Sequence, residues 1–94
     1  MFTISRSDNN TVVLEGRLDA SQVDAAAKIL DTLDTSTVID FTRLDYISSA
    51  GLGILLKTQK RLGTSGQSLK LVNMNKMIRD IFRIARFDLV FTIE

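Results

Sequence analysis

The sequence contains no cysteine and no histidine, and these absences narrow the chemistry that the chain can perform. A chain without cysteine has no disulfide framework. A chain without histidine cannot form a Ser-His-Asp triad, and without both residue types only oxygen ligands remain for a metal ion. The acidic residues show no calcium-loop spacing. We therefore expect no metal and no cofactor, although this argument leaves a carboxylate-only enzyme open.

The sequence also lacks the glycine-rich loop with lysine that holds phosphate groups in many nucleotide-binding enzymes. Its nearest match, residues 63–66 (Gly-Thr-Ser-Gly), has no lysine and is typical of a plain turn. No other motif supports catalysis. We predict that the chain is not an enzyme.

Charge of neither sign dominates, because 12 Lys and Arg residues stand against 11 Asp and Glu residues, for a net charge of +1. No basic run could follow a nucleic-acid backbone, and five Phe and one Tyr offer few rings for base stacking. No apolar run approaches the roughly 18 residues of a membrane span, and the N-terminus does not resemble a signal peptide. We expect no nucleic-acid partner, no membrane contact and a cytoplasmic location.

A length of 94 residues predicts a single domain over 1–94. Short apolar or alternating runs predict strands, and apolar residues at helical spacing predict helices between them, in the order β-β-α-β-α-β-α-β. This order predicts an α/β fold with parallel strand pairs. An opening hairpin, with a turn at 8–10, would add an antiparallel pair and so make the sheet mixed. The expected strands are 2–6, 11–16, 37–42, 69–72 and 89–93, and the expected helix faces are Val23, Ala27, Leu30 and Leu33, then Leu52, Leu55, Leu56 and Leu62, then Met77, Ile78, Ile81, Phe82 and Ala85.

The stretch 45–53 (Asp-Tyr-Ile-Ser-Ser-Ala-Gly-Leu-Gly) lies between the third expected strand and the second expected helix. Ser48 and Ser49 therefore lie near a helix start, where backbone N–H groups are unpaired and the helix dipole is positive. A phosphate group added there could be accommodated. From spacing alone, a helix cap is the simpler explanation of both serines.

Ile54 falls outside the apolar stripe of Leu52, Leu55 and Leu56, so we expect it on the surface, in an apolar patch for a partner protein. Gly51 and Gly53 both weaken a helix start. Close approach of a partner or of a neighbouring loop would explain both glycines.

Four local motifs stand out along the expected order of elements: 16–19 (Gly-Arg-Leu-Asp), 38–41 (Val-Ile-Asp-Phe), 46–52 (Tyr-Ile-Ser-Ser-Ala-Gly-Leu) and 79–91, the expected last helix and closing strand. Together with that order, they resemble the STAS domain of bacterial anti-sigma factor antagonists. The resemblance spans essentially the whole chain. It implies a small mixed β-sheet with helices packed on it, and a role as a partner-switching regulator of transcription.

In proteins of this kind, the serine two positions before the motif glycine is phosphorylated by an anti-sigma factor that is a serine kinase. Gly51 is the motif glycine, so the resemblance implies phosphorylation of Ser49. Ser48 is the runner-up, because it stands where the commonest motif has aspartate. The unmodified protein would bind the kinase, which then releases its sigma factor, and a serine phosphatase would remove the phosphate. Arg86 stands where the family often has glycine.

Motif and resemblance together give a set of candidate partner-binding residues around this serine. They are Asp19, Ile47, Ser48, Gly51, Leu52 and Ile54, with Asp40 as a supporting residue beside Ser49. Asp19 and Asp40 also have a purely structural explanation. Asp19, or Ser21 in its place, could cap the first helix, and Asp40 could be a solvated charge at a strand end.

Two other functions remain open from the sequence. The chain could be a STAS module that binds constitutively in a larger complex, such as a lipid-transport or stress-sensing assembly. It could also be a nucleotide-binding STAS module.

Overall fold

The computed structural model describes residues 1–8 and 10–94, and it confirms the order of elements expected from the sequence. The Asn10 N–H donates to Asp8 Oδ1 at 2.8 Å in the expected turn, of which Asn9 lies outside the described residues. The strands are β1 (Phe2–Asp8), β2 (Thr11–Leu18), β3 (Thr37–Ile47), β4 (Leu69–Val72) and β5 (Thr92–Ile93), the α-helices are α1 (Val23–Leu30), α2 (Ser49–Gly63) and α3 (Lys76–Ile84), and the 3-10 turns are η1 (Ala20–Gln22) and η2 (Phe87–Leu89).

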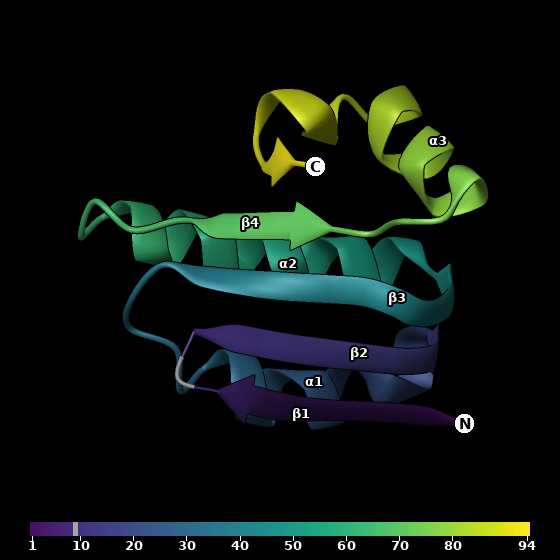
Figure 1. The fold of residues 1–94 in the computed structure, drawn as a ribbon, viewed down its shortest axis with the longest axis horizontal. Coiled ribbons are helices and arrows are strands. Elements are labelled where there is room, and N and C mark those ends of the chain that lie inside the picture. Colours follow the sequence, from purple (N-terminus) through teal and green to yellow (C-terminus); the bar gives the residue numbers. More distant parts are fainter. Residues whose placement is uncertain (9) are drawn as a thin grey trace.

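The strands form one five-stranded mixed sheet in the order β1-β2-β3-β4-β5 (Figure 1). β1 and β2 form an antiparallel hairpin, and each later strand runs parallel to its neighbour. Parallel neighbours cannot be joined by a tight turn, so a helix connects each pair across the sheet. Consequently β2 and β3 end side by side at the same edge, and both connections to α1 and α2 start there.

Helices α1 and α2 lie together against one face of the sheet (Figure 1). The strand side chains alternate accordingly, with Val12 and Leu14 of β2 and Ile39 and Phe41 of β3 fully buried beneath the helices. The residues between them are half-buried or exposed, so the other face of the sheet is open to solvent. Of the helices in residues 1–8 and 10–94, none is long and apolar enough to cross a membrane.

Helix α1 ends at Leu30, and the chain then continues without helical structure to the buried Leu33. The guanidinium group of Arg61 on α2 donates to the carbonyl oxygens of Leu30 at 2.9 Å and Leu33 at 2.8 Å. The Leu30 carbonyl oxygen also accepts from the Leu33 N–H at 3.1 Å, so Arg61 adds a second bond there and satisfies carbonyl groups at the end of the helix. Arg61 thus joins the end of α1 to α2.

Strand β3 extends to Ile47, beyond the expected end at Thr42. Its pairing with β2 shifts register between Asp40 and Arg43, which marks a β-bulge. The Thr42 N–H in this irregular stretch donates to Asp40 Oδ1 at 2.9 Å, so the amide is satisfied without a ladder partner. The bulge interrupts the alternation of apolar and polar residues, and this is why the pattern predicted an earlier end.

Helix α3 buries Ile78 and Phe82, which lie one turn apart, and begins at the cap of Asn75, whose Oδ1 accepts from the Ile78 N–H at 2.8 Å. Met77 and Ala85 were also expected on the buried face, but both are exposed. The expectation was wrong because this short helix lies at the edge of the layer and covers the core with a narrow stripe only.

The expected strand at 89–93 is wrong in its first half, where the chain forms η2, and only Thr92–Ile93 pair with β4. The ring centroids of Phe87 and Phe91 lie 6.2 Å and 5.8 Å from that of Phe82. Edge-to-face contacts of this kind stabilise a tight turn between the two rings. Tertiary packing here overrides the β propensity of the local sequence.

The turn between α3 and η2 depends on Arg86, which adopts the left-handed conformation with φ 64° and ψ 21°. This conformation costs a non-glycine residue roughly 1–2 kcal/mol, and glycine avoids that cost but loses about 0.4–1 kcal/mol through the entropy of the unfolded chain. We expect Arg86→Gly to raise the free energy of unfolding by about 0.5–1 kcal/mol, measured by chemical denaturation. Ala85→Gly, at a neighbour with negative φ, is the control and should lower it.

Candidate functional site

The site is the edge of the sheet where β2 and β3 end together, with Leu18 paired to Ile47. The Ser48 N–H donates to the carbonyl oxygen of Leu18 at 2.9 Å, one residue beyond this pair. Asp19 follows Leu18 directly, so the starts of η1 and α2 lie against each other at this edge. The two motifs around Asp19 and Ser48, distant in sequence, therefore form one surface.

Ser48 is the N-cap of α2, with an extended backbone at φ −89° and ψ 171°. Its hydroxyl oxygen accepts from the Gly51 N–H at 3.2 Å, and its carbonyl oxygen accepts from the Leu52 N–H at 2.9 Å. Both interactions satisfy amides of the first turn of the helix. The expectation that one serine caps the helix is confirmed for Ser48, whose side chain is half-buried by this role.

Ser49 is the first residue of α2, and its side chain is exposed. Its hydroxyl makes no hydrogen bond to any residue that the structure describes. The backbone amides of Ser49 and Ala50 precede the first intrahelical acceptor and point out of the helix end. A free hydroxyl thus stands where the helix dipole is positive.

Gly51 lets the first turn of α2 lie directly on the ends of the strands. A Cβ atom at this position would lie 2.9 Å from both Ile47 Cγ1 and Leu18 Cγ, and 3.1 Å from the carbonyl oxygen of Leu18. Real Cβ atoms do not approach so closely, so any larger residue would displace the helix. Gly53 differs, because a Cβ there would meet nothing within 4 Å. The expected close approach is therefore intramolecular at Gly51, and open space surrounds Gly53.

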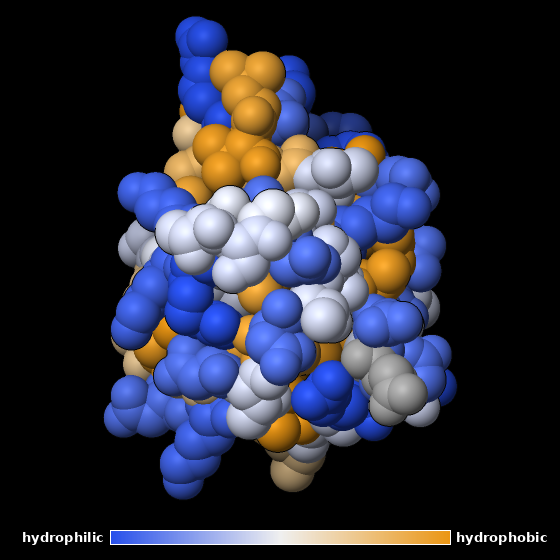
Figure 2. All heavy atoms as spheres, turned by 90° about the vertical axis from the view of Figure 1, so that its left-hand side faces the viewer, coloured by the Kyte–Doolittle hydropathy of each residue, from blue (hydrophilic) through white to orange (hydrophobic). Residues whose placement is uncertain are grey.

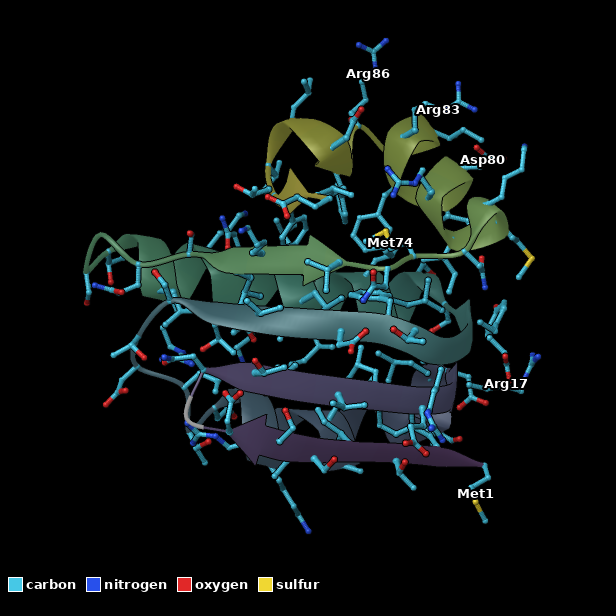
Figure 3. All side chains as sticks on the ribbon, viewed as in Figure 1. Met1, Arg17, Met74, Asp80, Arg83 and Arg86 are labelled. Carbon is cyan, nitrogen blue, oxygen red and sulfur yellow. The ribbon has the colours of Figure 1, made fainter. Side chains whose placement is uncertain are left out.

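Asp19 caps η1, and its Oδ1 accepts from the Ser21 hydroxyl at 2.6 Å and the Ser21 N–H at 3.0 Å. The bond from the Ser21 hydroxyl lowers the pKa of Asp19 below its usual value, and the Ser21 amide and Arg17 lower it further. Asp19 is therefore an anion at neutral pH, beside the two serines. Arg17 itself lies over the Tyr46 ring, 4.4 Å from its centroid, and projects at the same edge of the sheet (Figure 3).

Four of the expected partner-binding residues are buried and cannot meet a partner directly, namely Ile47, Gly51, Leu52 and Ile54. Ile47 is 2% exposed, Leu52 is 8% exposed, and Ile54, expected on the surface, is 7% exposed. Ile54 was misplaced because α2 is packed against both the sheet and α1, so it buries a wider face than one apolar stripe predicts.

The exposed face of α2 that continues from Ser49 is formed instead by Ala50, Gly53 and Lys57. These residues follow one another at the spacing of one helix face. Ala50 and Lys57 were not predicted from the sequence, because small and charged residues carry no apolar signal. Their spacing from Ser49 was the available clue.

Asp40 does not support Ser49, which corrects that expectation. It lies seven residues before the end of β3, which corresponds to roughly 20 Å along a strand. Its carboxylate instead accepts from Thr42 and from Asn73 Nδ2 at 3.2 Å, and the hydrogen bond from the Thr42 hydroxyl lowers its pKa most. Asp40 therefore stabilises the β-bulge and the loop after β4.

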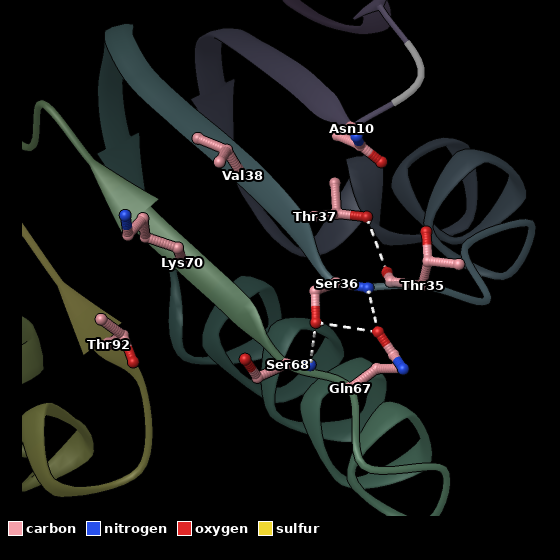
Figure 4. Close-up of a pocket in the computed structure, with 9 residues that line it drawn as sticks. All are labelled: Asn10, Thr35, Ser36, Thr37, Val38, Gln67, Ser68, Lys70 and Thr92. Carbon is pink, nitrogen blue, oxygen red and sulfur yellow. Dashed lines mark hydrogen bonds between the residues drawn. The ribbon is translucent and has the colours of Figure 1, made fainter.

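A hollow of about 410 Å³ lies elsewhere, between the starts of β3 and β4 (Figure 4). Its wall includes Ser36 and Gln67, where Gln67 Oε1 accepts from the Ser36 N–H at 2.8 Å, and the Ser36 hydroxyl oxygen accepts from the Ser68 N–H at 3.0 Å. These polar groups bind one another and hold two loops together. The hollow is remote from Ser48 and Ser49, because those residues follow the opposite end of β3.

Residues 2–92 match the protein-family model described as "Mlab, STAS domain". The chain belongs to the STAS-domain family. It is 33% identical over 82 residues to BtrV of Bordetella bronchiseptica, a candidate anti-sigma factor antagonist, covering 87% of this chain and 70% of that protein. The resemblance seen in the motifs of this STAS domain is thus confirmed.

Solved structures establish the same fold. The Bacillus cell-fate determinant SpoIIAA in its phosphorylated form has a TM-score of 0.72 and 22% identity, over 100% of this STAS domain and 91% of that chain. An anti-sigma factor antagonist from Mycobacterium paratuberculosis has a TM-score of 0.83 and 20% identity, over 99% of this chain and 83% of that one. The mixed sheet with helices on one face is therefore the STAS fold.

We expect Gly51→Ala and Gly53→Ala to change stability in opposite directions. The methyl group at Gly51 would collide with Ile47 and Leu18, which should lower the free energy of unfolding by about 1–3 kcal/mol. The same change at Gly53, an exposed helical position, should raise it by up to about 1 kcal/mol. Chemical denaturation of both variants tests this pair, and equal effects would contradict the contact described for Gly51.

We expect Ile54→Asp to destabilise the fold, because it places a carboxylate at a position that is 7% exposed. Burial of an unpaired polar group and loss of apolar contact should together cost more than about 3 kcal/mol. Lys57→Asp, on the exposed face of the same helix, should change stability by less than about 0.5 kcal/mol. Thermal melts followed by circular dichroism distinguish the two, and an unaltered melt for Ile54→Asp would place this residue on the surface after all.

Proposed function

We propose that this STAS domain is an anti-sigma factor antagonist controlled by phosphorylation of Ser49. In its unmodified form it binds an anti-sigma factor that is also a serine kinase, and that kinase then releases its sigma factor. Phosphorylation of Ser49 by the bound kinase ends the interaction, and a serine phosphatase restores it. The similarity to BtrV and the family assignment support the class of partner.

The observation that carries this proposal is the different state of the two neighbouring serines. The Ser48 hydroxyl is engaged as the cap of α2, whereas the Ser49 hydroxyl is exposed and unengaged among the described residues. A kinase needs an accessible hydroxyl that can move into its active site without unfolding the substrate. Ser49 meets this requirement. Ser48 would meet it only if its hydroxyl lost the hydrogen bond from the Gly51 N–H that caps α2.

The departure from the commonest motif leaves this arrangement intact. Serine and aspartate are about equally good N-caps, because each offers a side-chain oxygen to the amide three residues later. Ser48 therefore fills the position that aspartate fills in the commonest motif, and Ser49 keeps the position of the modified serine.

A phosphate on Ser49 would carry a charge of roughly −1.5 to −2 at neutral pH. In the free domain, the amides and the dipole at the start of α2 stabilise such a charge, so the fold persists. In the complex, the same charge would be removed from water without a partner, which opposes binding. The switch thus acts on the interface and not on folding.

The surface proposed to meet the kinase consists of Ser49, Ala50, Gly53 and Lys57 along α2, with Asp19 beside them. All of the α2 residues in this set are exposed. The single methyl group of Ala50 and the lack of a side chain at Gly53 let another backbone approach the helix closely. Ile47, Gly51, Leu52 and Ile54 act from beneath, by fixing where this surface lies.

We expect Ser49→Asp and Ser49→Ala to fold equally well but to bind the kinase differently. The aspartate should be tolerated or gain about 0.3–1 kcal/mol from the helix dipole. Its charge should weaken binding on the order of a hundredfold, because an unpaired charge becomes buried. Ser49→Ala should bind nearly as the wild type does. The measurement is calorimetric titration with the serine kinase encoded nearest to the gene.

Ser65→Asp is the matched control, since it adds the same charge at an exposed position in the loop after α2. It should leave binding unchanged. If Ser49→Asp and Ser49→Ala bind the kinase equally well, charge at Ser49 does not control binding, and the result would favour a domain that binds constitutively. Mass spectrometry of the kinase-treated protein identifies the modified residue, and phosphate on Ser48 would reverse the assignment.

A further inference from the structure

The end of α3 and the turn η2 expose large aliphatic side chains that the core does not use. Ile84 is 77% exposed and Leu89 is 78% exposed, whereas Phe82 and Phe91 of the same region are buried. Figure 2 shows hydrophobic atoms gathered at this end of the molecule, edged by hydrophilic ones. Exposed apolar patches rimmed by polar groups are typical of interaction sites.

These side chains surround a hollow of about 410 Å³. We call the surface that borders it the C-terminal patch, which consists of Arg83, Ile84, Arg86, Asp88 and Leu89. The left-handed turn at Arg86 separates α3 from η2, and it lets residues before and after the turn border the same hollow. The hollow therefore depends on the fold of this turn as well as on the side chains that line it.

The C-terminal patch lies in a segment with an excess of positive charge. Lys76, Arg79, Arg83 and Arg86 are exposed along α3 and the turn after it. Two carboxylates oppose these four basic residues: Asp80 is shared by Lys76 at 3.0 Å and Arg83 at 3.2 Å, and Asp88 borders the hollow itself.

Arg86 makes no side-chain hydrogen bond or ion pair to any residue that the structure describes. Figure 3 shows Arg83 and Arg86 projecting away from the sheet at this end. The Arg86 guanidinium is therefore suited to bind a carboxylate through two parallel hydrogen bonds, and Arg83, which uses one nitrogen for Asp80, keeps further N–H donors for another.

We propose that the C-terminal patch docks a short acidic segment of a partner protein. One aliphatic side chain of that segment enters the hollow between Ile84 and Leu89, and flanking carboxylates bind Arg83 and Arg86. A peptide matches the concave shape, since a side chain can fill a hollow. A lipid surface would instead contact the protruding tips, and it would leave the hollow unfilled.

This surface is separate from the serine site. Ser49 follows the end of β3, next to the end of β2, whereas α3 and η2 lie beside β4 and β5, toward the opposite lateral edge of the sheet from β1 (Figure 1). Gln59 in the second half of α2 donates to the Val90 carbonyl oxygen after η2 at 3.1 Å, but the start of α2 lies away from this turn, so a segment docked on the C-terminal patch leaves Ser49 free. The domain can hold two partners at once, and this inference does not depend on the phosphorylation proposed above.

The test is selection of a random peptide library, displayed on phage, against the purified full chain. We expect enriched peptides with an aliphatic residue between two or more Asp or Glu residues. A selected peptide is then titrated by fluorescence polarisation. Its affinity should fall at least tenfold in the double variant Arg83→Gln/Arg86→Gly and fall with added salt. Glycine suits the backbone at Arg86, so this variant should remain folded.

The matched control is Lys57→Gln/Lys60→Gln, which removes two exposed charges from α2 and should change affinity less than twofold. Ser49→Asp should bind the peptide as the wild type does, whatever becomes of kinase binding. Two outcomes overturn the proposal: no enrichment of acidic peptides, or equal affinity for the double variant. If no acidic peptide is enriched, patch-dependent binding to anionic lipid vesicles would assign the surface to a membrane. Concentration-dependent dimers that Leu89→Ser abolishes would assign the surface to a second copy instead.

Discussion

The close approach of helix α2 to the strand ends at Gly51 is the constraint on which the rest of the site depends. The missing side chain allows the first turn of the helix to lie on Leu18 and Ile47. The hydrogen bond from the Ser48 N–H to Leu18 then joins the start of this helix to the end of β2. Because two connections leave the sheet at this point, one small residue determines the position of both η1 and α2.

This constraint explains why adjacent serines have different chemistry. The backbone must turn from an extended strand into a helix within one residue, and Ser48 occupies that position with its hydroxyl directed back to the Gly51 amide. The next residue is the first of the helix and projects outward. A proposed regulatory charge at Ser49 therefore meets a rigid scaffold, since the residues beneath it are buried. Only the surface potential of the domain changes, which suits a switch that must leave the fold intact.

The sequence alone predicts the order of elements well, because the strands are short and apolar and the helices between them show helical spacing. Its errors have tertiary causes. Ile54 is buried because α2 contacts two layers, and a single-stripe pattern cannot show the second one. Asp40 accepts a hydrogen bond within a β-bulge that the local sequence pattern does not predict.

The C-terminal segment shows the same limit. Residues 89–93 have strong β propensity, yet the rings of Phe87 and Phe91 pack around Phe82 and shorten the strand to two residues. The location of the candidate site follows from the sequence, because two of the motifs contain Ser49 and Asp19. The residues that shape its surface were less predictable, since Ala50 and Gly53 contribute by lacking large side chains, which no apolar pattern shows.

The parallel pairing of β3 has a consequence for how the chain acquires its structure. Val38 pairs with Thr11 on one side and with Lys70 on the other, so the central strand has neighbours that are distant in sequence on both sides. Within the described chain, the β1–β2 hairpin is the one pair of strands joined by a tight turn. Topologies with many such distant contacts fold slowly, because long loops must close before the contacts form. During synthesis on the ribosome, β3 and α2 leave the exit tunnel before β4 and β5 do, so the sheet cannot be completed until the last third of the chain has emerged.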